Sequence, residues 1–279
     1  SQASVGGTAF FNTTSFNSPM QGNYAWMGIL HETGHALGLK HGHESPAVSP
    51  AHDSLEYTVM TYRSYVGDPI AGGYSNEAGG YPQTLMMLDI AALQQMYGAD
   101  FTTNSGNTIY SWSPSTGTFN VNGVSEWTPF SNRVLMTIWD GGGTDTYDLS
   151  NYANGVTIDL RPGQWSTTST IQLANLGEGN FARGNVANAL LFTGATGSLI
   201  EEAKGGAADA ALIAAKARNL LTGNAGADTF RWMSASDAAT GSNADVIADL
   251  LRGADRIDLS DVDANAATQA DDAFSFIGT

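Results

Sequence analysis

The chain has 279 residues, 42% of them hydrophobic, and no cysteine, so it can build ordinary cores but offers no disulfide and no thiolate ligand or nucleophile. Its formal net charge of -16, from 27 acidic and 11 basic residues, repels phosphate backbones and anionic membranes. This charge, and the lack of an apolar run that could span a bilayer, argue against nucleic-acid-binding and membrane-spanning proteins. The acidity reflects either solubility alone or carboxylates that bind divalent cations.

Helical spacing of apolar residues marks two segments in the first part of the chain. It predicts one helix over residues 25–40 and a second over residues 84–97, which Gly98 would stop. The short apolar stretch Ala9–Phe11 suggests a strand. Residues 42–82 contain Gly, Pro, Ser and Asp throughout, so we expect loops there.

The composition changes after about residue 100, where short apolar runs alternate with clusters of Gly, Asn, Asp and Thr. This pattern predicts many short strands. A junction near residues 98–104 would divide the chain into domains at 1–99 and 100–279. Residues 201–221 conflict with the pattern, because they are rich in Ala and Lys and propensity alone favours a helix there.

The strongest motif is a set of three histidines in and after the first helix. His31 and His35 lie one helical turn apart on the same face and can hold one zinc ion. Gly38 permits a sharp turn, which would bring His41 round as the third ligand. Glu32 lies beside them, within reach of a zinc-bound water.

Three protein ligands leave one position open, which is typical of a catalytic rather than a structural zinc. The metal would lower the pKa of its water to about 7, and Glu32 would take that proton and pass it to the leaving amine. The alternative is an ordinary amphipathic helix with buried histidines. Three of the five histidines fall in this one motif, so chance explains it poorly. His43 and His52 lie in the loop region and are interpreted as surface histidines.

A second motif follows at residues 58–62 (TVMTY). Alone, a methionine among apolar residues is core filling. After the histidine motif, the segment resembles the methionine turn of metzincins, which implies that Met60 lies beneath the zinc. The tyrosine two residues after that methionine is similar to one at the same position in serralysins and astacins. This resemblance implies that Tyr62 can ligate zinc and also hydrogen-bond the oxyanion.

Four further segments resemble the serralysin family of secreted bacterial proteases: 88–99 (LDIAALQQMYGA), 139–147 (WDGGGTDTY), 223–230 (GNAGADTF) and 254–260 (ADRIDLS). The resemblance implies an α+β fold. Residues 1–99 would be the C-terminal part of a metzincin-like catalytic domain with two main helices. Residues 100–279 would form an all-β, parallel β-roll or sandwich that binds calcium. Relative to that family the chain looks short at both ends, and Gly42 stands where serralysins usually carry proline.

The calcium prediction follows the logic of the GGxGxDxUx repeat, in which glycines turn backbone carbonyls toward an ion and Asp supplies charge. A single Gly-Asp turn is otherwise a plain β-turn. The resemblance implies one site at Asn104, Gly106, Thr108, Asp140, Gly142 and Asp145, a neighbouring site at Gly143, Asp145, Leu199 and Glu201, and a last repeat with Gly223, Gly226 and Asp228.

Two turns within 205–221 depart from the repeat, because the usual Asp positions hold Ala210 and Arg218. We expect these turns to bind calcium poorly. Leu212, Leu220 or Leu221, and Phe230 nevertheless recur at near-repeat spacing, so we predict β-roll strands rather than a helix for this segment.

These motifs predict a secreted endopeptidase that uses one catalytic zinc and several structural calcium ions, with polypeptide substrates. An alternative is a non-catalytic calcium-binding module with a vestigial zinc site, against which the intact Glu32 speaks. A zinc hydrolase of small amides is a third possibility. No N-terminal signal peptide is visible, which fits one-step export by a C-terminal signal. The resemblance also implies a small protein inhibitor as partner, and we expect a monomer.

Overall fold

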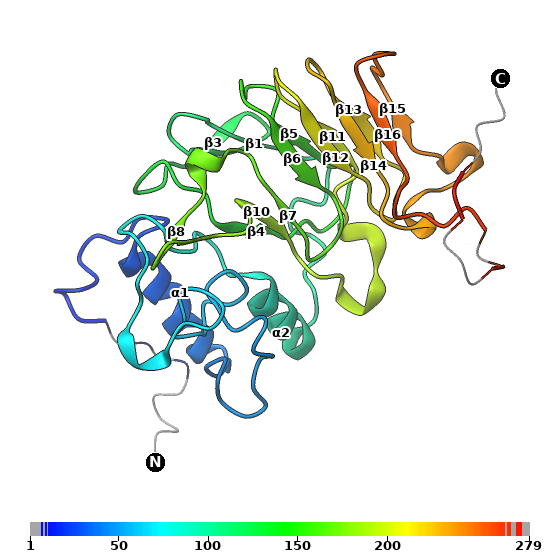
Figure 1. Cartoon of the computed structure of the whole chain (residues 1–279). Coiled ribbons are helices and arrows are strands. Elements are labelled where there is room, and N and C mark those ends of the chain that lie inside the picture. Colours follow the sequence, from blue (N-terminus) through cyan, green and yellow to red (C-terminus); the bar gives the residue numbers. More distant parts are fainter. Residues whose placement is uncertain (1–6, 8, 10, 266, 269–271, 275–279) are drawn as a thin grey trace.

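The structure is a computed structural model that describes residues 7, 9, 11–265, 267–268 and 272–274 (Figure 1). Two α-helices lie at one end of the molecule, and sheets of short strands extend from them toward the C-terminus (Figure 1). Within these residues the helical elements are α1 (Tyr24–Ala36), α2 (Met87–Tyr97) and six short 3-10 turns at Ile70–Gly72, Thr170–Gln172, Phe192–Gly194, Thr196–Ser198, Ala235–Asp237 and Gly241–Asn243.

Both helices expected from the sequence are present, and local signals explain their ends. The side chain of Asn23 caps α1 by accepting a hydrogen bond from the backbone N–H of Trp26 at 2.9 Å. The helix ends before Gly38, whose φ of 98° turns the chain away, so it is shorter than predicted at its C-terminus. Gly98, with a φ of 86°, ends α2 as predicted. Of the strand expected at Ala9–Phe11, residue 10 lies outside the described residues, and its two neighbours are not in a strand.

Two sheets dominate the second part of the chain, and the chain alternates between them from residue 202 onward. In the described residues, one sheet has the order β15-β13-β11-β5-β1-β2-β3, and its strands are β1 (Ile109–Trp112), β2 (Phe119–Val121), β3 (Val124–Trp127), β5 (Thr146–Asp148), β11 (Glu202–Lys204), β13 (Leu220–Thr222) and β15 (Val246–Ile247). The other has the order β16-β14-β12-β6, with strands β6 (Val156–Asp159), β12 (Ala210–Ile213), β14 (Thr229–Arg231) and β16 (Arg256–Asp258).

The pairings within these sheets are parallel, except that β1, β2 and β3 are antiparallel. Because successive strands join opposite sheets, each winding of the chain adds one strand to each sheet. Inward side chains from both sheets, among them Tyr147, Leu212 and Phe230, are at most 1% exposed and belong to one core. Shared burial of apolar surface therefore joins the two sheets.

Residues 201–221 form strands, as predicted, and not a helix. Leu212, Leu221 and Phe230 are each fully buried, which settles the choice between Leu220 and Leu221. One detail of the sequence prediction was wrong. Strand pairing aligns Glu202 with both Thr146 and Leu220, so Asn219, and not Arg218, takes the place of Asp145 in this turn. Without Gly-Asp signals to mark the repeat, its register could be read one residue off.

Smaller sheets connect the helical part to the main sheets. They consist of β4 (Met136–Ile138), β10 (Val186–Asn188) and β7 (Trp165–Ser166), and of β8 (Asn175–Gly177) and β9 (Asn180–Phe181). A cluster of buried side chains crosses between the parts, including Met60, Met86 and Leu135. Ion pairs join Glu77 to Arg133 at 2.5 Å. The loops between the two helices thus rest on the strand region and are fixed by it.

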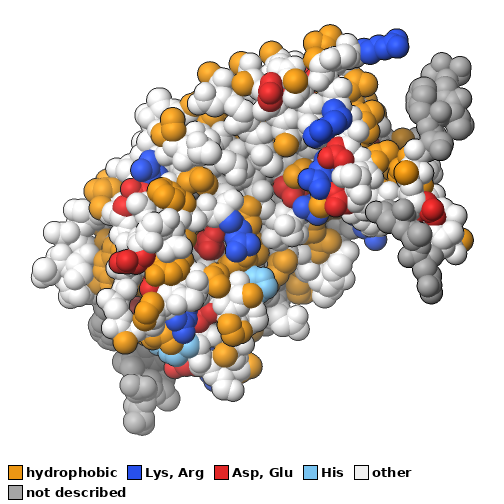
Figure 2. All heavy atoms as spheres, viewed as in Figure 1, with side chains coloured by type: hydrophobic (Ala, Val, Ile, Leu, Met, Phe, Trp, Pro, Cys, Tyr) orange, Lys and Arg blue, Asp and Glu red, His pale blue; other side chains and the backbone are white. Residues whose placement is uncertain are grey.

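On the face shown in Figure 2, acidic and basic side chains are interspersed, and histidines lie on the lower, helical part. Among the described residues, no helix has the length and apolar character needed to cross a bilayer.

Candidate metal centre

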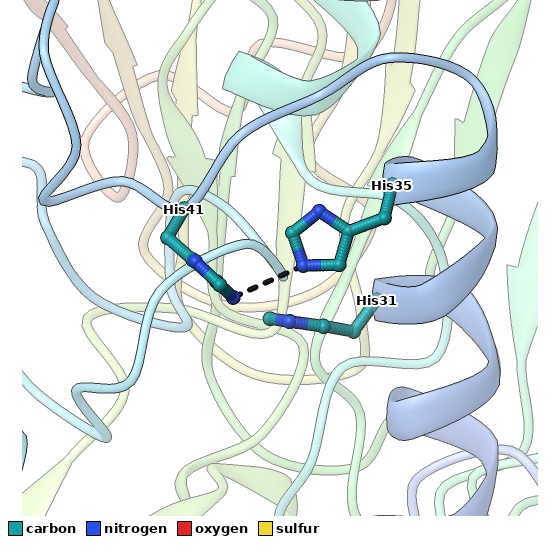
Figure 3. Close-up of side chains that lie close together, drawn as sticks. All are labelled: His31, His35 and His41. Atoms are coloured by element: carbon teal, nitrogen blue, oxygen red, sulfur yellow. Dashed lines mark hydrogen bonds between the residues drawn. The ribbon is translucent and has the colours of Figure 1, made fainter. Parts of the chain in front are cut away.

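Three histidines converge beside α1, although they come from two different elements. His31 and His35 project from the helix, and His41 reaches toward them from the loop that follows (Figure 3). One potential ligand atom from each ring lies within 4.8 Å of the others. The turn at Gly38 makes this possible, because it reverses the chain and lets the N–H of Leu39 bond to the carbonyl of Gly34 at 2.9 Å. The structure thus brings together all three predicted imidazoles.

Backbone carbonyls fix the orientation of two of the rings. The Nδ1 atom of His31 lies 2.7 Å from the carbonyl oxygen of Val59, and that of His35 lies 2.9 Å from the carbonyl oxygen of Leu39. A carbonyl only accepts hydrogen bonds, so each Nδ1 carries the proton and each Nε2 presents a lone pair. This arrangement of neutral imidazoles is the one that a metal ion requires.

His41 completes the set by facing His35 directly. The two Nε2 atoms lie 3.0 Å apart, as the dashed line in Figure 3 shows. The Nδ1 of His41 is 3.4 Å from a carboxylate oxygen of Glu44, a residue that the sequence motif did not single out. With its proton directed to Glu44, His41 also turns a lone pair toward the cluster. Converging lone pairs repel one another unless a cation lies between them, so the donor set fits a metal ion such as zinc.

Burial supports the neutral form of His31, which is 6% exposed. Burial is the largest effect and lowers the pKa of His31 below its ordinary value, with a smaller lowering from His35, against the raising effect of the bond to Val59. Neutral imidazole is the ligating form.

Met60 packs against the helix at the level of the histidines. A Cβ atom at Gly34 would lie only 2.4 Å from the Sδ atom of Met60. Residue 34 must therefore be glycine for the methionine to come this close, and Met60 itself is 2% exposed. The sequence-based prediction placed Met60 beneath the metal, and the structure places it on the same helical face as His31 and His35.

Tyr62 lies beside the three rings. Its hydroxyl oxygen is 2.7 Å from Nε2 of His41, and its ring stacks on His31 at a centroid distance of 5.8 Å. Burial, then the charge of Glu32, raises the pKa of the Tyr62 hydroxyl above its ordinary value, so the group stays protonated at neutral pH.

The two remaining histidines do not belong to the cluster. His43 is exposed and stacks on His41, with ring centroids 5.3 Å apart and an interplanar angle of 10°. His52 contacts Ser49 and the ring of Tyr57 instead.

A buried carboxylate that sequence analysis missed supports the turn beneath the histidines. Asp89, on α2, accepts hydrogen bonds from the hydroxyl of Thr58 and from the backbone N–H groups of Val59 and Met86, the last two at 2.8 and 2.9 Å. Burial raises its pKa to about 6. The carbonyl of Val59 orients the ring of His31, so Asp89 supports this candidate metal ligand through Val59. The sequence offered one signal for Asp89, namely an acidic residue in the first turn of an apolar helix.

The predicted calcium residues Asp140, Asp145 and Glu201 also come together. The backbone N–H of Asp145 donates to Glu201 at 2.9 Å, and Oδ1 of Asp145 accepts from Thr108 at 2.8 Å. The other oxygen of Asp145, Oδ2, is buried and finds no partner among the described residues. Burial, with a smaller contribution from the charge of Asp140, raises the pKa of Asp145 to about 7 and that of Glu201 to about 7.

Backbone groups of the other predicted calcium donors lie close to Asp140 and Asp145. The hydroxyl of Thr108 donates to the carbonyl oxygens of Asn104 and Gly106 at 3.0 and 2.8 Å. A Cβ at Gly143 would lie 2.5 Å from the carbonyl oxygen of Gly106 and 2.9 Å from Asp145 Oδ1. Gly142 has a φ of 138° and follows Asp140, to which its N–H donates. The side chain of the predicted donor Leu199 is buried in the core, which leaves its backbone as the polar part.

The last repeat is built differently. Oδ1 of Asp228 accepts from the N–H of Ala210 at 2.7 Å, and a Cβ at Gly223 would lie 2.2 Å from Asp228 Oδ2. Gly226 has a φ of 131° and approaches the backbone of Asp209. Burial, then neighbouring carboxylates, raises the pKa of Asp228; sequence analysis missed these neighbours, which are Asp255, Asp249 and Asp209. Their own oxygens accept from backbone N–H groups of the turns.

Comparison with known proteins matches this architecture. A family model described as Peptidase M10 serralysin C terminal matches residues 99–279. Serralysin C of Dickeya chrysanthemi is 34% identical over 166 residues, covering 56% of this chain and 33% of the relative. Metalloprotease AprA of Pseudomonas entomophila (strain L48) is 34% identical over 290 residues, covering 92% of this chain and 53% of that protein. Metallopeptidase AprA of Pseudomonas marginalis is 31% identical over 307 residues, covering 98% and 59%.

The fold and the site define a β-rich protein with a cluster of three histidines that fits a metal ion. The chain belongs to the serralysin family, whose relatives carry the names serralysin and metalloprotease. It spans between 33% and 59% of the length of the three relatives described above. The two longer alignments leave out too little of the chain to miss the histidine segment.

Proposed function

We propose that the chain is part of a secreted zinc endopeptidase, with the end of a metzincin-like catalytic domain at residues 1–99 and a calcium-binding β-roll at 100–279. The observation that carries the proposal is the convergence of three imidazoles, two of them with Nδ1 fixed by backbone carbonyls. Family membership supports it, because two of the relatives named above are called a metalloprotease and a metallopeptidase. Polypeptides are the proposed substrates.

His31, His35 and His41 would hold the zinc ion, with Tyr62 beside it. When bound, zinc supplies a Lewis acid that acidifies water and polarises a carbonyl group. Glu32 takes the proton from the attacking water and returns it to the leaving amine. The Tyr62 hydroxyl, kept protonated by its raised pKa, donates a hydrogen bond to the developing oxyanion. Met60 supports the helix face from which two of the ligands project.

Calcium would bind among Asp140, Asp145 and Glu201, next to the carbonyl of Gly106, and in weaker form at Asp228. The buried, unpartnered oxygen of Asp145 supports this assignment, because a buried carboxylate oxygen without a donor is costly unless a cation satisfies it. The close glycine backbones fit a cage of hard oxygen ligands. The winding of the chain between two parallel sheets is the geometry expected of a β-roll.

Metal content and proteolysis test the proposal together. Purified protein should contain one zinc per chain, and casein hydrolysis should stop with a zinc chelator and return when zinc is added back. A protein that takes up no zinc would contradict the proposal, as would one that cleaves casein equally well with the chelator. Zinc uptake without any cleavage would favour the non-catalytic module with a vestigial site.

A further inference from the structure

Two segments that follow α1 in the chain meet at the histidine centre, and they are called the two arms below. One is the loop that carries His41, and the other is the turn that carries Met60 and Tyr62. The hydroxyl of Tyr62 lies 2.7 Å from His41 Nε2, so the relative placement of the arms decides where this hydroxyl sits. Asp53, which is 6% exposed, lies between the arms and contacts both.

Asp53 holds both neighbours of Tyr62. Its Oδ1 accepts a hydrogen bond from the Thr61 hydroxyl at 2.5 Å, and its Oδ2 forms an ion pair with Nε of Arg63 at 2.9 Å. The carbonyl of Thr61 also accepts from the Tyr74 hydroxyl at 2.6 Å. With the residues on each side fixed, the backbone at Tyr62 has little freedom, and its side chain is directed to the centre.

The same carboxylate packs against the other arm at Gly42. A Cβ at residue 42 would lie 2.9 Å from Asp53 Oδ1, closer than such contacts occur. Because Oδ1 is already bonded to Thr61, it cannot move away without breaking that bond. The N–H of Gly42 donates to the carbonyl of Met60 at 2.9 Å, so proline here would lose a bond as well as collide. This contact explains why glycine directly follows His41.

We propose that Asp53 is a positioning residue that locks the His41 loop to the Tyr62 turn and so places the Tyr62 hydroxyl at the metal centre. The inference rests on the proposed function, because it assumes that a metal binds there. His31 and His35 come from α1, and Asp53 contacts neither Val59 nor Leu39, whose carbonyls orient these two rings. Loss of Asp53 therefore disturbs Tyr62 while the helical ligands stay in place.

Copper absorption gives a direct measure of where the Tyr62 hydroxyl sits. Cu2+ that binds a tyrosine oxygen displaces the phenol proton to solvent, and the copper–phenolate bond produces a charge-transfer band. The wild-type protein loaded with Cu2+ should show a band that the Tyr62→Phe variant lacks. Asp53→Ala should lose most of this band while it still binds one Cu2+ per chain. The matched control is Glu56→Gln, a buried carboxylate that is ion-paired to Arg183 and bonds neither Thr61 nor Arg63. Its band should be unchanged.

Gly42→Ala tests the lock without removing any charge. Gly42 does not have a positive φ, so alanine adds only the collision with Asp53. We expect the band to fall in Gly42→Ala but not to fall further when Gly42→Ala is added to Asp53→Ala, because both act through one contact. Gly72→Ala is the control, since a Cβ there meets nothing within 4 Å. This series also covers the case in which Asp53→Ala fails to fold.

Peptide hydrolysis supplies an independent measurement. Asp53→Asn should lower kcat/KM by about 10- to 100-fold, with most of the loss in kcat, as for other groups that orient a metal-site residue. The loss should be much smaller in a Tyr62→Phe background. An unchanged copper band in folded Asp53→Ala and Gly42→Ala would overturn the role of Asp53. A wild-type protein that takes up neither zinc nor copper would overturn the proposed function itself.

Discussion

The histidine centre and the acidic turns are both candidate metal sites, yet their donors are held in opposite ways. At the histidine centre, neutral rings are oriented by backbone carbonyls of Val59 and Leu39 and by Glu44. At the acidic turns, Asp140, Asp145 and Glu201 are brought together as like charges in a largely buried place.

This difference separates catalysis from stability. Neutral ligands with fixed tautomers keep their arrangement at little electrostatic cost, so the histidine centre is organised before a metal arrives. Clustered carboxylates repel each other until a cation neutralises them, so folding of the acidic turns is linked to calcium. Changes at the first site should alter the rate of hydrolysis, and changes at the second should alter the free energy of unfolding.

The largest effect is expected for Glu32→Ala. Loss of the general base should lower kcat for casein peptides by about 10²- to 10⁴-fold, because proton transfer in the transition state is lost. Zinc content and melting temperature should stay near wild type, since Glu32 is not among the clustered ligands. Glu126→Ala, at an exposed carboxylate on β3, is the control. Full activity in Glu32→Ala would remove this residue from the mechanism.

Calcium removal should give the next largest effect, on stability rather than rate. Calcium at about 1,000 times its dissociation constant stabilises the folded state by about 4 kcal/mol per site, and this is lost in excess EGTA. Thermal unfolding followed by circular dichroism measures the change. Asp145→Asn should respond less to calcium than wild type does. An identical melting temperature with and without calcium in the wild-type protein would show that the acidic turns bind none.

The sequence predicted the local parts of the molecule and missed the long-range ones. His31 and His35 were predictable because helical spacing alone puts them on one face, and Gly38 explained how His41 joins them. Strands at 201–221 were predictable because the inward apolar positions recur. In each case the residues that determine the local structure lie within the sequence pattern itself or a few residues from it.

The partners of Asp53 and Asp89 could not be found in this way. Asp53 bonds residues 8 and 10 positions further on, and Asp89 bonds residues about 30 positions earlier. Such partners are set by how the loops pack on the strand region, which a sequence pattern does not contain. The misplacement of the acidic position at Arg218, in place of Asn219, has the same origin, because strand pairing alone fixes the register of a turn that lacks Gly and Asp.

The acidic turns should also make stability depend on pH, in calcium-free protein. Burial raises the pKa of Asp145 and Glu201 to about 7, so the folded state binds more protons than the unfolded state between about pH 4 and 7. This stability is fully present below pH 4 and is lost as the pH rises through 7, a loss on the order of 2–3 kcal/mol. Urea unfolding at pH 5 and pH 8 should show it. Saturating calcium, or Asp145→Asn, should reduce the difference; an equal loss in all samples would locate its source elsewhere.

The smallest effect, and the sharpest test of register, comes from comparing Asn219→Asp with Arg218→Asp. Asn219 is fully buried; its side-chain amide donates to the carbonyl of Glu201 at 3.1 Å, and its N–H donates to Asp245. A carboxylate at 219 loses that donor and faces Asp245, so without calcium it should cost about 1 to 2 kcal/mol. Calcium should restore part of this lost stability, because the new oxygen stands at the position that Asp145 holds in its own turn.

Arg218 is exposed, so aspartate there should change the free energy of unfolding by no more than about 0.5 kcal/mol and gain no calcium response. If instead Arg218→Asp had the larger cost and the calcium response, the turn would follow the register read from the sequence. Residue 218, and not 219, would then stand at the position of Asp145.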